Sequence, residues 1–211
     1  MHLADEIREL VRAGFSGIWI QSFEPEDAIA ELAQLSQAEQ WRLASWDIDA
    51  GLRGLESSAG VAVIDPLSAV RSLASMPSDG QPTLLVMANL HRFLGSAEVV
   101  QSLVRQVSQG KVQQQHLIVL APVVQLPVEL ERIFTVVEHE LPTRDQLEEI
   151  ATGIAAAEEF PAGTERDRVL DAACGLSRYE AENAFALSLF RWFGMVASNL
   201  RPSGNSNRKR C

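Results

Sequence analysis

The sequence predicts an α/β protein in which a parallel five-stranded sheet, the middle of three layers with helices on both faces, precedes a small all-helical subdomain. Two observations support this prediction. Over residues 1–140, short apolar runs alternate with amphipathic helical segments, which is typical of strands buried on both faces. After Pro142 the strand-like runs stop and only helical patterns remain.

The five predicted strands are short apolar runs that polar or glycine-containing segments separate. They span residues 17–23, 41–46, 83–88, 116–121 and 134–138. The third run reads Thr-Leu-Leu-Val-Met-Ala and is the clearest of them, since almost every position is apolar. We therefore expect both faces of the sheet to be covered.

Four helices are predicted, one before the first strand and three between strands, from apolar residues at helical spacing. They cover residues 3–13, a segment that begins at 25, residues 65–76 and residues 96–109. Gly14 and Gly110 are predicted to end the first and the fourth helix. Pro25 opens the second, with Glu26 and Asp27 in the first turn, where carboxylates favour the positive end of the helix dipole.

Three helices are predicted after residue 140, at roughly 144–159, 165–174 and 178–193. Thr143 and Gln146 fit a capping box, as do Ser177 and Glu180, and Thr164 is a predicted N-cap. We therefore divide the chain into an α/β domain (1–140), a helical lid (141–193) and a basic, disordered tail (194–211).

Charge and composition favour a soluble intracellular protein. The net charge is −10, although residues 191–211 carry five Arg or Lys and no acid, so the first 190 residues carry −15. Such an acidic body repels nucleic-acid backbones and anionic membranes. No apolar run approaches the roughly 20 residues of a membrane helix, and the acidic N-terminus is unlike a signal peptide.

Alternating strands and helices make a phosphate-binding P-loop the first motif to seek, and it is absent. The loop needs glycines, a lysine and a Ser or Thr. The chain has two lysines, Lys111 and Lys209. Lys111 follows Gly110, but Arg105 stands at the position of the first glycine and Val112 replaces the Ser or Thr.

The turn after the first strand carries Glu24, Glu26 and Asp27, whose charges repel a triphosphate. The third strand ends at Asn89 and His91, where a working NTPase has an acidic Mg²⁺ ligand. Asn89 is a poor ligand for Mg²⁺. His91 offers a proton-transfer group, but a surface histidine is the favoured interpretation. We therefore expect no catalytic residue and no cofactor for this chain.

Other chemical patterns are weak. Asp47 and Asp49 resemble a two-carboxylate Mg²⁺ clasp, yet such pairs are common in loops after strands, and no metal site is predicted. The four histidines are dispersed, and Cys174 is expected to be a small core residue.

Two segments resemble AAA+ ATPases. Residues 126–142, with Arg132 before the fifth predicted strand and Leu141-Pro142 after it, are similar to the stretch that follows the fourth strand of that fold. Residues 175–184, Gly-Leu-Ser-Arg-Tyr-Glu-Ala-Glu-Asn-Ala, are similar to a segment of its lid. The closest resemblance is to the N-terminal region, without a P-loop, of the AAA-type ATPases of the forty-sixth conserved chloroplast and cyanobacterial reading frame.

The resemblance implies a P-loop-NTPase-like fold, a location in the cytoplasm (or plastid stroma) and, for the family, ATP and Mg²⁺. It suggests a degenerate lobe that serves oligomer assembly or partner docking for an ATP-driven remodelling module. Arg132 is then a candidate arginine finger and Arg178 a candidate phosphate sensor, although a solvated surface arginine is the simpler interpretation of both. Asn89 and His91 complete the candidate nucleotide-site residues.

Two other interpretations stay open. One is a free-standing protein-interaction module without nucleotide dependence. The other is an enzyme of another class that uses Asp47, Asp49 or His91. The shift to a basic composition at residues 191–211 also suggests a truncated or frame-shifted product, which a P-loop codon run in the downstream DNA would reveal.

Overall fold

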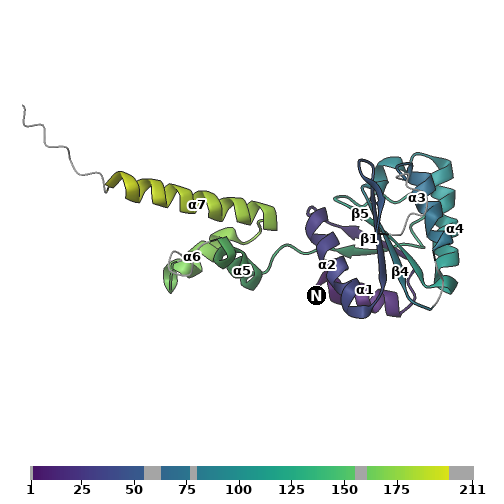
Figure 1. Cartoon of the computed structure of the whole chain (residues 1–211), viewed down its shortest axis with the longest axis horizontal. Coiled ribbons are helices and arrows are strands. Elements are labelled where there is room, and N and C mark those ends of the chain that lie inside the picture. The colour runs from purple at the N-terminus through teal and green to yellow at the C-terminus, as the bar shows by residue number, and fades with distance from the viewer. Residues whose placement is uncertain (1, 55–62, 77–79, 155–160, 200–211) are drawn as a thin grey trace, which may run out of the picture. The chain divides into compact units, whose positions relative to one another are not determined.

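The computed structural model describes residues 2–54, 63–76, 80–154 and 161–199 (Figure 1). The chain divides into two compact units, Met1–Glu140 and Leu141–Cys211. Two predicted features fall partly outside the described residues. These are the end of the helix predicted over 144–159 and most of the tail predicted over 194–211.

The first unit contains a sheet that is parallel except at one edge. Its strands are β1 (Gly17–Gln21), β2 (Arg42–Asp47), β3 (Gly51–Arg53), β4 (Thr83–Ala88), β5 (Gln115–Ala121) and β6 (Thr135–Glu138). Their order across the sheet is β3-β2-β4-β5-β1-β6, and only the β2–β3 pair is antiparallel. The predicted fold class is confirmed, and all five predicted strands are present.

The predicted strand count was one too low because β3 carries no apolar run. After β2 the chain reverses in a tight turn in which Asp47 Oδ1 accepts hydrogen bonds from the backbone N–H groups of Asp49 and Ala50, at 2.9 and 2.6 Å. The carboxylate that sequence reasoning considered for Mg²⁺ thus shapes a hairpin.

Helices cover both faces of the sheet (Figure 1). On one face, α1 (Leu3–Arg12) and α2 (Pro25–Glu39) pack on alternate strand residues such as Ile18 and Ile20. On the other, α3 (Pro66–Ser72) and α4 (Ala97–Gln113) pack on strand residues such as Trp19 and Val119. Two short 3₁₀ helices, η1 (Leu73–Ser75) and η2 (Leu90–Phe93), complete this unit's described elements.

Gly110 does not end α4, contrary to the prediction. It lies buried within the helix, which continues to Gln113 and ends at Gln114 in the left-handed conformation. A Cβ atom at Gly110 would stand 2.3 Å from the carbonyl oxygen of Gln115. The glycine therefore permits the helix to approach the start of β5 closely.

The second unit consists of α5 (Arg144–Ile154), α6 (Thr164–Ala173) and α7 (Arg178–Asn199). Its small core contains Leu147, Ile150, Ala151, Leu170, Ala173, Ala181 and Phe185. No helix in the described part of the chain is long and apolar enough to cross a membrane.

Two of the three predicted N-cap residues of these helices are confirmed. In both capping boxes the N-cap residue and the third residue exchange hydrogen bonds: Thr143 with Gln146, and Ser177 with Glu180. Thr164, however, is the first residue of α6, after Gly163. Cys174 also differs from the prediction, because it follows α6 and is exposed.

Candidate functional site

The candidate site lies at the carboxyl end of β1. In open parallel sheets, ligands bind at the carboxyl edge where the connections from two adjacent strands leave on opposite faces. Here the connection from β1 runs through α2 on one face, whereas the connection from its neighbour β5 packs on the other face through Leu130 and Phe134. The turn between β1 and α2 is therefore the place to look for a bound ligand.

The β1–α2 turn is short, and hydrogen bonds fix its conformation. Only residues 22–24 separate β1 from α2. The backbone N–H of Ser22 donates to Ala121 O at 3.0 Å, and Ser22 Oγ accepts from the N–H of Glu24 at 3.0 Å. Trp19 Nε1 donates to Val123 O at 3.2 Å. The end of β1 is thus held against the start of the β5–β6 connection.

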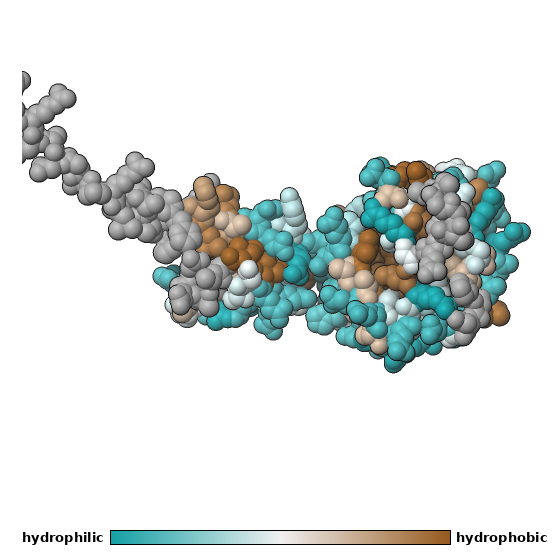
Figure 2. Space-filling view, in the orientation of Figure 1, coloured by the Kyte–Doolittle hydropathy of each residue, from teal (hydrophilic) through white to brown (hydrophobic). Residues whose placement is uncertain are grey.

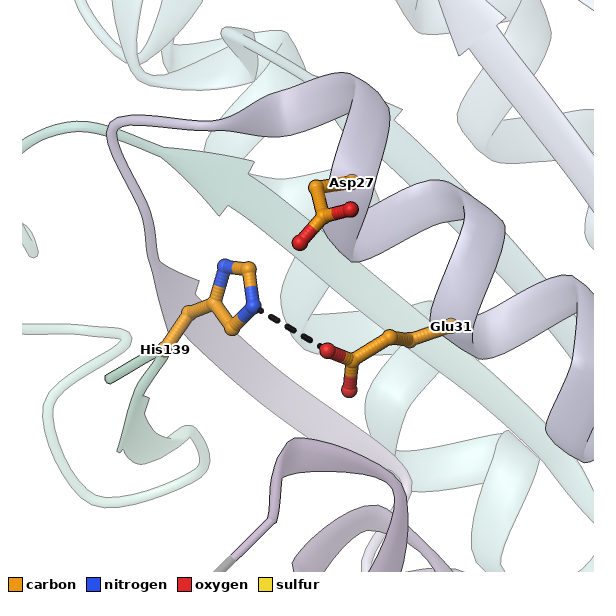
Figure 3. A group of neighbouring side chains, drawn as sticks. All are labelled: Asp27, Glu31 and His139. Atoms are coloured by element: carbon orange, nitrogen blue, oxygen red, sulfur yellow. Dashed lines mark ion pairs between the residues drawn. The ribbon is translucent and has the colours of Figure 1, made fainter. Parts of the chain in front are cut away.

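A chain of polar side chains joins this turn to α2. Ser22 Oγ lies 2.8 Å from His139 Nδ1, and His139 Nε2 lies 3.5 Å from Glu31 Oε1 (Figure 3). The carboxylate of Glu31 raises the pKa of His139, and the same contact lowers the pKa of Glu31. The nearby carboxylates of Asp27 and Glu24 raise the His139 pKa further.

Sequence reasoning missed this group because His139 is 117 residues from Ser22. Parallel pairing of β6 with β1 sets Glu138 beside Gln21, and the N–H of His139 donates to Gln21 O at 2.9 Å. The one available signal was the spacing of Asp27 and Glu31, four residues apart on one helix face.

The residues at this edge do not fit Mg²⁺ and a triphosphate. A P-loop spans about eight residues and wraps phosphate with backbone N–H groups and a lysine, whereas three residues form this turn. Ser22 already accepts the N–H of Glu24. Lys111 is in the last turn of α4, before the amino end of β5. Glu24 and Asp27 add negative charge, so a phosphate meets repulsion here.

Asn89 and His91, two of the predicted site residues, lie after β4, which β5 separates from β1. Asn89 is exposed and has the left-handed conformation that starts η2. His91 is only 8% exposed, so the interpretation as a surface histidine was wrong. The turn of η2 carries its ring inward, burial lowers its pKa, and its Nδ1 has no hydrogen-bond partner among the described residues.

The two arginines of the resemblance belong to different units. Arg132 is exposed and directly precedes Ile133, whose carbonyl oxygen faces Gly17 at the amino end of β1. It therefore lies at the sheet edge opposite Ser22. Arg178 is the first residue of α7, and its Nε is 3.2 Å from Glu182 Oε1.

Comparisons with known proteins point to one family. A family model described as the N-terminal domain of a SpoVK-like AAA ATPase matches residues 3–139, and a model of the second domain matches residues 145–192. The protein ycf46 of Trieres chinensis, described as an uncharacterized AAA domain-containing protein, is 25% identical over 148 residues. The match covers 70% of this chain and 30% of that relative, so the chain spans less than a third of its length.

A solved structure, that of C. elegans PCH-2, is similar with a TM-score of 0.56. The similarity covers 91% of this chain and 68% of that chain, at 10% sequence identity. At this identity the likeness concerns the fold alone.

Proposed function

The chain belongs to the SpoVK-like AAA ATPases, and we propose that it is a degenerate AAA lobe that serves oligomer assembly or partner docking. In this proposal the lobe does not hydrolyse ATP by itself. It acts for an ATP-driven remodelling module that carries the P-loop. ATP and Mg²⁺ are then cofactors of the family and of that module, and not of this chain.

The observation that carries the proposal is the turn at residues 22–24. In this fold, the connection after the first strand is where a P-loop would stand. Here Ser22 is hydrogen-bonded to His139, and the neighbouring charges are carboxylates. This turn has no phosphate-binding groups, so we infer that the sheet serves as a scaffold that presents a binding surface to other proteins.

Exposed apolar side chains support a role in protein contacts. Leu187 and Phe190 on α7 are 52% and 77% exposed and, three residues apart, share one face of the helix. Figure 2 shows hydrophobic surface on the helical unit. Apolar surface of this kind is typical of sites that bind another protein.

The first test is a titration of the purified chain with fluorescent ATP and ADP in the presence of Mg²⁺. We expect no saturable binding at micromolar nucleotide, because the turn lacks a lysine and carries carboxylates. Saturable micromolar binding that unlabelled ATP displaces would contradict the proposal.

The second test concerns assembly. Sedimentation velocity over a range of concentrations should show self-association that is the same with and without MgATP. The double variant Leu187→Gln, Phe190→Gln should weaken it, while Val112→Gln, which also replaces an exposed apolar residue (87% exposed), should not. A monomer at all concentrations that also fails to bind a coexpressed P-loop module of the family would reject the proposal.

The alternative, a free-standing interaction module, shares the exposed face of α7 but needs no ATPase module. The coexpression arm separates the two, because a stable complex with the P-loop module is expected only for the AAA lobe.

A further inference from the structure

We propose that Asp27, Glu31 and His139 bind a divalent transition-metal ion of the zinc class. Each residue offers one ligand atom, and these atoms all lie within 4.8 Å of one another. Figure 3 shows the three side chains converging from α2 and from the residue after β6. Among the residues that the structure describes, this is the one group of its kind.

The two carboxylates are placed by the helix. Asp27 and Glu31 are four residues apart on α2, so both lie on the face that borders the end of β6. This is a rigid support, since α2 packs on the sheet through Ala28 and Leu32, which are fully buried. Ligands on such an element need little reorganisation when a metal binds.

The imidazole is oriented by a residue outside the metal group. A histidine that binds a metal through one ring nitrogen usually makes a hydrogen bond with the other. Here Nδ1 is 2.8 Å from Ser22 Oγ, which leaves Nε2 on the side of Glu31. When the Nδ1–H donates to Ser22, Nε2 carries the lone pair that a metal requires.

The separation of the ligand atoms suits a shared ion. His139 Nε2 and Glu31 Oε1 are 3.5 Å apart, which is longer than the roughly 2.7–3.2 Å of a good N–H···O hydrogen bond. Ligands at about 2.0–2.1 Å in a tetrahedral zinc site lie roughly 3.4 Å apart. An ion therefore fits between these two atoms with little movement, and the carboxylate of Asp27 supplies the third ligand.

The ligand types select the class of metal. Imidazole favours Zn²⁺, Ni²⁺ and Cu²⁺, whereas Mg²⁺ favours oxygen ligands and retains several waters. Two carboxylates balance the charge of a divalent ion, and Glu24 adds to the negative potential at His139. Three protein ligands leave a fourth position for water. The bound ion would tie the first turns of α2 to the end of β6.

The test uses the full chain after chelator treatment and dialysis. Cys174 is exposed and Cys211 is a second thiol, so both are first alkylated to remove competing ligands. Zn²⁺ is then titrated at pH 7.5 by calorimetry, and Co²⁺ by visible absorption. We expect one equivalent of Zn²⁺, not displaced by excess Mg²⁺, and Co²⁺ bands of a site with low coordination number.

Variants assign the site. Glu31→Gln and His139→Gln each remove a ligand and should weaken Zn²⁺ binding by more than about a hundredfold, and Ser22→Ala, which releases the ring, by about tenfold. Glu26→Gln, which removes an exposed carboxylate from the same turn of α2, should leave binding unchanged. Asp27→Asn provides a second ligand variant if circular dichroism shows that His139→Gln is unfolded.

Two results would overturn the proposal. One is the absence of stoichiometric Zn²⁺ binding in the alkylated chain. The other is binding that the folded ligand variants retain at the affinity of the unmodified sequence. Neither result depends on whether the chain binds nucleotide, so this inference and the proposed function can fail separately.

Discussion

The two units of the chain are stabilised in different ways. The sheet unit buries large side chains in two cores, one on each face of the sheet, with Trp19 and Trp46 almost completely removed from solvent. The helical unit has one small core, and two of its helices begin at the capping boxes of Thr143 and Ser177. We therefore expect the same kind of substitution to have unequal effects on the stability of the two units.

The largest expected effect is that of Trp19→Ala in the sheet unit. Trp19 is fully buried, packs edge-on against Phe134 with ring centroids 6.3 Å apart, and donates to Val123 O. Truncation leaves a cavity and an unpaired carbonyl, and should lower the free energy of unfolding by about 3–5 kcal/mol. Urea denaturation followed by circular dichroism measures the loss.

The control is Phe23→Ala, which removes an aromatic ring that is 73% exposed in the same unit. It should change the free energy of unfolding by less than about 0.5 kcal/mol. Hydrogen exchange measured on peptides should show that Trp19→Ala, and not Phe23→Ala, reduces the protection of amide groups in β1 and β5. Equal losses of unfolding free energy in the two variants would contradict the dominant role of the buried core in this unit.

The pattern of confirmed and wrong predictions follows the same contrast. Strands such as β4 and β5 could be predicted because burial on both faces favours apolar residues at most positions. The capping boxes could be predicted because they are local. The strand β3 could not, because a short edge strand needs no apolar run, and neither could the inward position of His91, which depends on the turn of η2.

The candidate site was less predictable than the fold. The acidic β1–α2 turn and the missing P-loop were visible in the sequence, as were Asp27 and Glu31. The partner of Glu31 was not, because only the pairing of β6 with β1 brings His139 to Ser22. Tertiary contacts between residues that are distant in sequence leave no periodic signal.

The second prediction compares glycines in helices of the two units. Gly110→Ala in α4 forces a Cβ against the backbone oxygen of Gln115 and should destabilise the sheet unit by about 1–3 kcal/mol. A Cβ atom at Gly153 in α5 would meet no neighbouring group within 4 Å among the described residues, so Gly153→Ala should stabilise the helical unit by up to about 1 kcal/mol.

The same substitution is thus expected to have opposite signs in the two units. Thermal unfolding followed by circular dichroism, with hydrogen exchange to assign each unit, checks both variants. Destabilisation by Gly153→Ala would show that the end of α5 is more constrained than the open space around this glycine indicates.

The third and smallest effect is a pH dependence that only the sheet unit should show. All four histidines are at or before residue 139, so residues 141–211 contain none. His116 is 2% exposed, its Nδ1 is 2.7 Å from Phe15 O, and burial lowers its pKa below 6.5. The unfolded chain therefore binds the proton first as the pH falls through about 6.5.

Below that pH the sheet unit should lose stability, by at most about 1.4 kcal/mol per pH unit for the proton of His116, until the folded state also binds it. His116→Gln should reduce the slope of unfolding free energy between about pH 6.5 and 5, and the exposed His2→Gln is the matched control. Urea denaturation at several pH values, with tryptophan fluorescence as the probe, measures the slope, because three of the four tryptophans belong to the sheet unit. An unchanged slope in His116→Gln would mean that other groups, the buried His91 or the carboxylates, and not His116, determine the acid sensitivity of the sheet unit.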